Sequence, residues 1–110
     1  MPTIRLQTKI NADKSLVFDL SRSIDLHKLS AQQTDEEAIA GITSGCIGMN
    51  ESVTWRAKHF GVYLKLTSKI TAFKRPDFFI DEMEKGPFKR FTHEHIFKET
   101  DDHTLMIDIF

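Results

Sequence analysis

The chain has 110 residues, which is enough for one domain built around one hydrophobic core. Hydrophobic residues make up 40% and charged residues 28%, and the net charge of −1 lacks the basic excess typical of a nucleic-acid-binding domain. The single cysteine excludes an internal disulfide, and no stretch approaches the ~18 apolar residues of a membrane span. Because the N-terminus carries no continuous apolar signal segment, we expect a cytoplasmic protein.

The first third of the chain changes its hydrophobic period once. Residues 3–11 alternate between apolar and polar side chains, which predicts a half-buried strand. A helix is predicted next, since Asn11 or Asp13 can cap its start. Its apolar positions recur at helical spacing: Leu16, Val17, Leu20 and Ile24. A second short helical turn is expected around 25–28, and the polar segment 30–37 is expected to be a loop.

The rest of the chain reads as strands separated by turn residues. The expected strands are residues 37–43, 52–60, 62–73, 78–84, 88–99 and 104–110. Turns about every ten residues between alternating segments are typical of an antiparallel meander. We therefore predict an α+β fold in which a curved antiparallel sheet of about six to seven strands wraps around one or two short helices.

Strand alternation also predicts which side chains share a face of the sheet. Within 62–73, it places Leu64, Leu66, Ile70 and Ala72 on one face. In the segment FTHEHIF, it places two imidazoles between two phenylalanines: Phe91, His93, His95 and Phe97. Histidines at such positions can line a pocket, bind a metal, transfer protons, or form structural hydrogen bonds to neighbouring strands.

Four segments resemble a known superfamily: IDLH at 24–27, residues 40–62, DEMEKGPF at 81–88 and FTHEH at 91–95. They are similar to SRPBCC proteins, which include START domains, polyketide cyclase-like proteins and the birch-pollen allergen class. Within that group they look most like a bacterial branch of small ligand-binding proteins loosely labelled cell-division-inhibitor-related. The resemblance implies a helix-grip fold, with a deep cavity between an antiparallel sheet and a long C-terminal helix.

This chain departs from the family pattern at its end. The C-terminal helix of the family is absent, because the chain stops at Phe110 within a strand pattern. We therefore expect residues 1–110 to form a single SRPBCC-like domain without that helix. If Phe110 is the true end, the uncovered apolar face and the last strand predict a homo-oligomer.

Strand parity and the resemblance together predict a ligand pocket. Its expected lining is Trp55, His59, Leu64, Leu66, Phe79, Asp81, Phe91, His93, His95 and Phe97. A metal at His93 and His95 would need a third ligand such as His59, because protein metal sites usually have three or more protein ligands. We expect neither a metal nor any other cofactor. Structural histidines and a polar pocket floor both remain open interpretations.

Two classes of function are compatible with this pocket. The first is a binding module for a small hydrophobic or amphipathic ligand. The alternative is a cyclase- or dehydratase-type enzyme that uses His93, His95 and a carboxylate such as Asp81 on a polyketide-like or aromatic substrate. The sequence contains no recognisable set of nucleophile, base and orienting residue, which favours binding over catalysis. The expected partner is therefore a small apolar ligand, with no nucleic acid and no membrane span.

Overall fold

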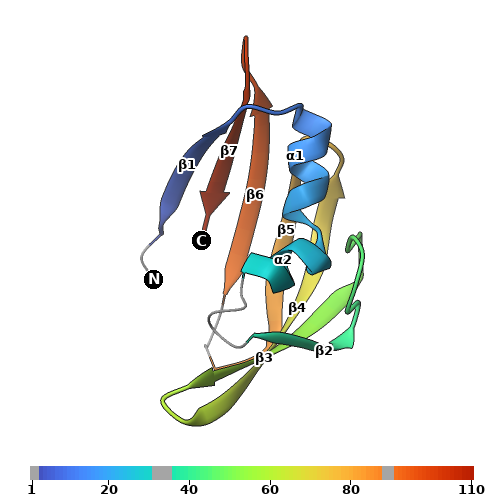
Figure 1. Cartoon of the computed structure of the whole chain (residues 1–110), viewed down its shortest axis with the longest axis vertical. Coiled ribbons are helices and arrows are strands. Elements are labelled where there is room, and N and C mark those ends of the chain that lie inside the picture. Colours follow the sequence, from blue (N-terminus) through green and yellow to red (C-terminus); the bar gives the residue numbers. More distant parts are fainter. Residues whose placement is uncertain (1–2, 31–35, 88–90) are drawn as a thin grey trace.

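An antiparallel sheet curves around two short helices in the computed structural model, which describes residues 3–30, 36–87 and 91–110 (Figure 1). The elements follow the predicted order: β1 (Arg5–Ile10), α1 (Lys14–Ser21), α2 (Ile24–Ser30), β2 (Glu37–Gly41), β3 (Ser52–His59), β4 (Val62–Lys74), β5 (Phe78–Lys85), β6 (Thr92–Glu99) and β7 (Thr104–Ile109). Most of the predicted loop 30–37 and the start of the predicted strand 88–99 lie outside the described residues.

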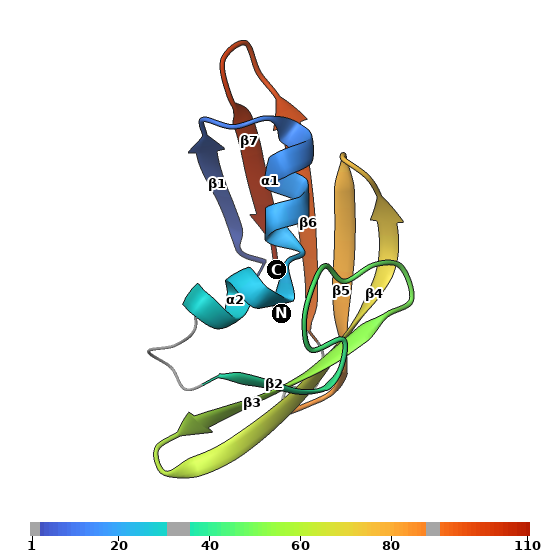
Figure 2. The same ribbon diagram turned by 45° about the vertical axis from the view of Figure 1, so that its right-hand side comes forward.

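The seven strands of the described part form one sheet in the order β1-β7-β6-β5-β4-β3-β2. Consecutive strands from β2 to β7 pair as neighbours, and β1 closes the other edge by pairing with β7. Both helices lie on the same side of the sheet, and β2 and β3 curve beneath them (Figure 2). The predicted α+β class and strand number are confirmed. Among the described residues, no helix is both long and apolar enough to span a bilayer.

Helix α1 contributes one large aromatic side chain, Phe18, to the hydrophobic core between the helices and the sheet. Its start is capped by Asp13, whose carboxylate accepts a hydrogen bond from the Ser15 backbone N–H at 3.1 Å. Phe18 is fully buried and meets three aromatic rings of the sheet edge-to-face: Phe73 at 5.3 Å, Phe79 at 5.4 Å and Phe97 at 5.2 Å. Opposite this face, Leu16 and Leu20 remain exposed.

Phe97 therefore occupies a different place from the one the sequence predicted. It is 2% exposed and packs beneath α1, as part of the core rather than of a cavity wall. The reason is the position of α1, which contacts β6 and β7 and covers this end of the sheet. Helix α1 thus covers Phe97 and the neighbouring part of the sheet.

A bulge in β4 changes which of its side chains face the helices. The pairing with β5 runs from Ile70 opposite Asp81 to Ala72 opposite Ile80, which leaves Thr71 as an extra residue. Beyond the bulge, Phe73 packs against the core, so Ala72 does not share the face of Ile70. Simple alternation along 62–73, which placed the two side chains together, is wrong at this point.

An ionic cluster fixes α1 to the turn between β4 and β5. Asp19 lies 2.9 Å from Arg22 and 2.6 Å from Arg75, while Lys14 pairs with Asp77 on the same turn. The hydrogen bond from Arg75, acting against partial burial and aided by Arg22, lowers the pKa of Asp19 to about 2. The carboxylate is therefore charged at all but strongly acidic pH.

Candidate functional site

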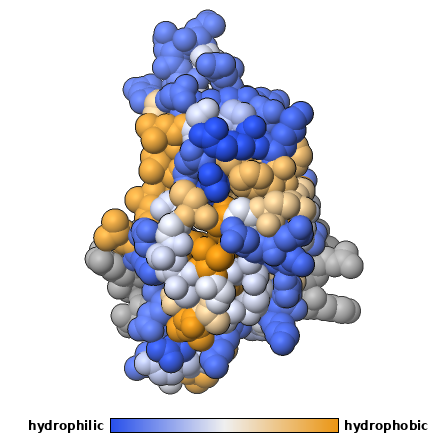
Figure 3. All heavy atoms as spheres, turned by 90° about the vertical axis from the view of Figure 1, so that its right-hand side faces the viewer, coloured by the Kyte–Doolittle hydropathy of each residue, from blue (hydrophilic) through white to orange (hydrophobic). Residues whose placement is uncertain are grey.

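A cavity of about 480 Å³ lies between the junction of the two helices and strands β3 to β6. The helix side contributes Ser21, Arg22, Ser23, Ile24 and His27, and the connecting segments add Glu36, Ile47 and Pro87. The sheet contributes Val53, Trp55, Ala57, Leu64, Lys65, Leu66, Ser68, Ile70, Phe79, Asp81, Phe91, His93 and His95. On the side of the molecule that carries β4, hydrophobic atoms gather in patches between hydrophilic ones (Figure 3).

Eight of the ten side chains proposed from the sequence lie around this cavity: Trp55, Leu64, Leu66, Phe79, Asp81, Phe91, His93 and His95. Phe97 is instead buried in the core beneath α1. The side chain of His59 lies outside the described part of the structure. The geometry therefore assembles most of the proposed set, and its role in binding remains a prediction.

Helix α2 contributes a second histidine-containing wall, which strand parity did not identify. The His27 ring lies 4.2 Å from the Trp55 indole, and its Nε2 lies 3.6 Å from a carboxylate oxygen of Glu36. Both His27 and Glu36 line the cavity. The IDLH run thus joins the site through helix packing rather than through the sheet.

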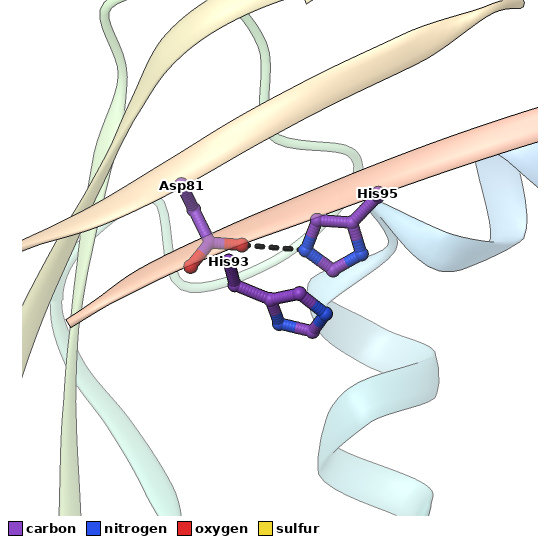
Figure 4. A group of neighbouring side chains, drawn as sticks. All are labelled: Asp81, His93 and His95. Carbon is purple, nitrogen blue, oxygen red and sulfur yellow. Dashed lines mark hydrogen bonds and ion pairs between the residues drawn. The ribbon is translucent and has the colours of Figure 1, made fainter. Parts of the chain in front are cut away.

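The two histidines of β6 form a compact cluster with Asp81, shown in Figure 4, and with Asp108. The rings of His93 and His95 stack 3.7 Å apart, and His95 also stacks on Phe79 at 4.1 Å. Asp81 of β5 lies 2.6 Å from His95 Nε2, and Asp108 of β7 lies 3.0 Å from His93 Nε2. Since β6 is hydrogen-bonded between β5 and β7, each aspartate comes from a different neighbouring strand. The structure therefore provides hydrogen-bond partners for both imidazoles.

Asp108 was missed by the sequence analysis, although a signal was present. It is the only carboxylate in the otherwise apolar strand TLMIDI of β7, and it shares a face with Met106. Register places it directly opposite His95. An isolated acidic residue on the inward side of an apolar strand indicates a buried partner, because a buried charge without one is costly.

The two imidazoles of the cluster have opposite electrostatic environments. Burial, together with the charge of nearby His95, lowers the pKa of His93. Burial also acts to lower the pKa of His95, but its hydrogen bonds to Asp108 and Asp81 outweigh that effect and raise it. The hydrogen bond from His95 is the largest cause of the lowered pKa of Asp108. The cluster therefore favours a neutral ring at His93, a charged ring at His95 and an ionised carboxylate at Asp108.

Asp81, His93 and His95 also meet the first spatial requirement of a metal site. Each offers one ligand atom, and these atoms lie within 4.8 Å of one another. The carboxylate of Asp81 thus stands where the sequence analysis looked for His59. However, one oxygen of the Asp81 carboxylate is already hydrogen-bonded to His95. The other oxygen accepts a hydrogen bond from Ser68 Oγ at 3.2 Å. These hydrogen bonds satisfy Asp81 and His95 without requiring an ion.

Comparison with known proteins gives the fold. No family model matches the chain, and no curated protein matches it by sequence. Solved structures do match: TTHA0849 from Thermus thermophilus has a TM-score of 0.75 at 16% identity and covers 98% of this chain and 71% of its own. The chain has the helix-grip fold.

Two further solved structures support this assignment. Protein Ms6760 from Mycobacterium smegmatis has a TM-score of 0.72 at 15% identity, covering 97% of this chain and 69% of its own. Ginseng major latex-like protein 151 from Panax ginseng has a TM-score of 0.70 at 15% identity, covering 98% of this chain and 76% of its own. The helix-grip fold that the SRPBCC resemblance implies is confirmed, and membership of that superfamily and the cell-division label remain predictions.

Proposed function

We propose that this protein binds a small hydrophobic or amphipathic molecule in the cavity between its helices and strands β3 to β6. The observation that carries the proposal is the cavity itself, about 480 Å³ in volume and walled by Trp55, Leu64 and Leu66. Ligand sites in proteins typically have volumes of about 300–1,000 Å³, with apolar walls and a few placed polar groups. Asp81, His93 and His95 supply such polar groups at one place in the wall.

A neutral fluorescent probe, N-phenyl-1-naphthylamine, tests this proposal. We expect its emission to rise on binding to the wild-type protein, and the Ala57→Trp variant to lose at least about tenfold in affinity because the indole fills part of the cavity. Lys58→Trp is the matched control, because Lys58 neighbours Ala57 in β3 and does not line the cavity. Equal affinities of all three proteins would contradict binding in the cavity.

An enzymatic function of the cyclase or dehydratase type is the second candidate. One observation favours it: His93 is held by Asp108, and its lowered pKa favours the neutral ring, which can accept a proton. Turnover of a polyketide-like test substrate, with a pH–rate profile that changes in the Asp108→Asn variant, would support catalysis. Binding of the same compound without turnover would support the binding module.

Self-association and a cytoplasmic location are further parts of the proposal. Self-association is proposed because the described structure leaves several apolar side chains about half exposed: Ile4, Leu6, Leu16 and Leu20. A second copy of the chain would remove this apolar surface from water. Light scattering over a dilution series tests association, and a species that remains a 12.7 kDa monomer at all concentrations would contradict it.

A further inference from the structure

The hydrogen bonds of the histidine–aspartate cluster leave one imidazole nitrogen for a ligand. The Asp81 carboxylate accepts from His95 Nε2 at 2.6 Å and from Ser68 Oγ at 3.2 Å. The Asp108 carboxylate accepts from His93 Nε2 at 3.0 Å and lies 3.5 Å from His95 Nδ1. Both nitrogens of His95 and both oxygens of Asp81 are therefore engaged, while the two contacts to Asp108 end on Oδ1 of a residue that does not line the cavity. Within the described residues, Nδ1 of His93 is the ring nitrogen of the cluster without a hydrogen-bond partner.

The protonation of His93 follows from its neighbours. An ionised carboxylate only accepts hydrogen bonds, so the hydrogen of a neutral His93 ring must lie on Nε2, which faces Asp108. The ring stacks 3.7 Å from His95, which lies between two carboxylates and carries the positive charge. A second imidazolium stacked on the first would be disfavoured by like-charge repulsion. Nδ1 of His93 is therefore a bare acceptor.

This acceptor is also open to the cavity. His93 lines the cavity, and its side chain is 22% exposed. Among the described residues, no side-chain nitrogen or oxygen is both sealed from solvent and without a partner. An unpartnered Nδ1 must then be reachable by water or by a ligand atom.

We propose that the ligand is a neutral hydroxyl compound, a phenol or alcohol on an apolar body, whose O–H donates a hydrogen bond to Nδ1 of His93. This inference rests on the proposed binding function and names the class of its ligand. An ether or ketone would place a lone pair against the Nδ1 lone pair. A carboxylate at this position would likewise direct a lone pair at Nδ1 and would lie near the carboxyl groups of Asp81 and Asp108.

Three probes of similar size separate these classes: 2-naphthol, 2-methoxynaphthalene and 2-naphthoate. Titrations of the wild-type protein, at a pH where 2-naphthol is neutral, should show 2-naphthol binding about fivefold more tightly than the ether, because one hydrogen bond is worth about 1 kcal/mol. We expect 2-naphthoate to bind most weakly. Equal affinities for the naphthol and the ether, or tightest binding of the naphthoate, would overturn the inference.

The variant His93→Phe locates the preference at Nδ1. It retains an aromatic ring on β6 and should reduce the ratio of naphthol affinity to ether affinity to about one. His103→Phe is the control, since His103 lies in the β6–β7 turn and outside this cavity. A preference retained in His93→Phe would contradict the assignment.

A measurement on the wild-type protein keeps the inference testable if His93→Phe fails to fold. In ¹⁵N spectra of the histidine rings, 2-naphthol should move the Nδ1 resonance of His93 toward the hydrogen-bonded position, and 2-methoxynaphthalene should not. An unmoved resonance at saturating naphthol would overturn the inference. If none of the three probes binds or displaces N-phenyl-1-naphthylamine, the proposed binding function itself fails, which is a separate outcome from the loss of preference.

Discussion

Asp108 on β7 accepts a hydrogen bond from Nε2 of His93 on β6 at 3.0 Å, across one pair of neighbouring strands. The same carboxylate lies 3.5 Å from Nδ1 of His95, so one residue of β7 orients both rings. Fixed rings can present defined acceptors and donors to a ligand, because little ordering remains to be done on binding. The pair therefore connects the last strand of the chain to the chemistry of the cavity.

Replacement of Asp108 should change the titration of His95. Its hydrogen bond and charge raise the pKa of His95, so we expect a lower His95 pKa in the Asp108→Asn variant, as measured by NMR titration of the ring protons. Asp101→Asn is a control, because this residue is exposed in the turn between β6 and β7. An unchanged His95 pKa in Asp108→Asn would contradict the described coupling.

Charged His95 should stabilise the fold more at low than at high pH. An unfolded histidine titrates near 6.5, and the pKa of native His95 is raised above this value. Between these two pKa values the native state therefore binds more protons than the unfolded state. The stability that charged His95 contributes is fully present below pH 6.5 and is lost as pH rises through the native pKa. Urea unfolding of wild type and His95→Gln across this range should show their stability difference shrinking with rising pH. A stability difference that grows with rising pH would contradict a raised pKa of native His95.

Asp19 should act in the opposite pH direction. Its native pKa of about 2 lies below the ordinary value of 3.8, so its contribution is present above 3.8 and is lost as pH falls toward 2. We expect the wild-type protein to be more stable than Asp19→Asn near neutral pH, with the gap closing in acid. Asp102→Asn, at an exposed position in the turn between β6 and β7, is the matched control. The measurement is urea unfolding at several pH values.

Phe18 should be the most sensitive position of α1. Phe18→Ala removes the ring that meets Phe73, Phe79 and Phe97, and we expect a loss of about 3–5 kcal/mol in the free energy of unfolding. Leu16→Ala, on the exposed side of the same helix, should cost well under about 1 kcal/mol. Similar losses in the two variants would show that α1 does not pack as described.

Removal of metal should leave the protein unchanged. We expect EDTA treatment to preserve the circular dichroism spectrum and the affinity for N-phenyl-1-naphthylamine, because hydrogen bonds already satisfy Asp81 and His95. Stoichiometric zinc found by elemental analysis, or loss of folding on chelation, would contradict this expectation.

Most of the fold could be predicted from the sequence because each element has a clear period and a clear break. The strands alternate over five to thirteen residues, and α1 begins at a capping aspartate. What alternation cannot predict is a register shift: the extra residue Thr71 moves Phe73 into the core. It also cannot predict which face of an amphipathic helix lies over Phe97.

The site was predictable only in part, for the same physical reason. Parity within one strand placed His93 and His95 on one side together with Phe91. The residues that bind these imidazoles come from the neighbouring strands, and cross-strand partners depend on the register of β5 and β7. Asp81 was therefore proposed without a defined partner, and Asp108 was not proposed at all.

Native mass spectrometry of the purified protein tests ligand binding in the cavity most directly. The account predicts a small apolar or amphipathic adduct on the wild-type protein, or on protein incubated with 2-naphthol, that is lost in Ala57→Trp and retained in Lys58→Trp. The absence of any adduct on the wild-type protein under both conditions, or an adduct retained equally by Ala57→Trp, would contradict binding in this cavity.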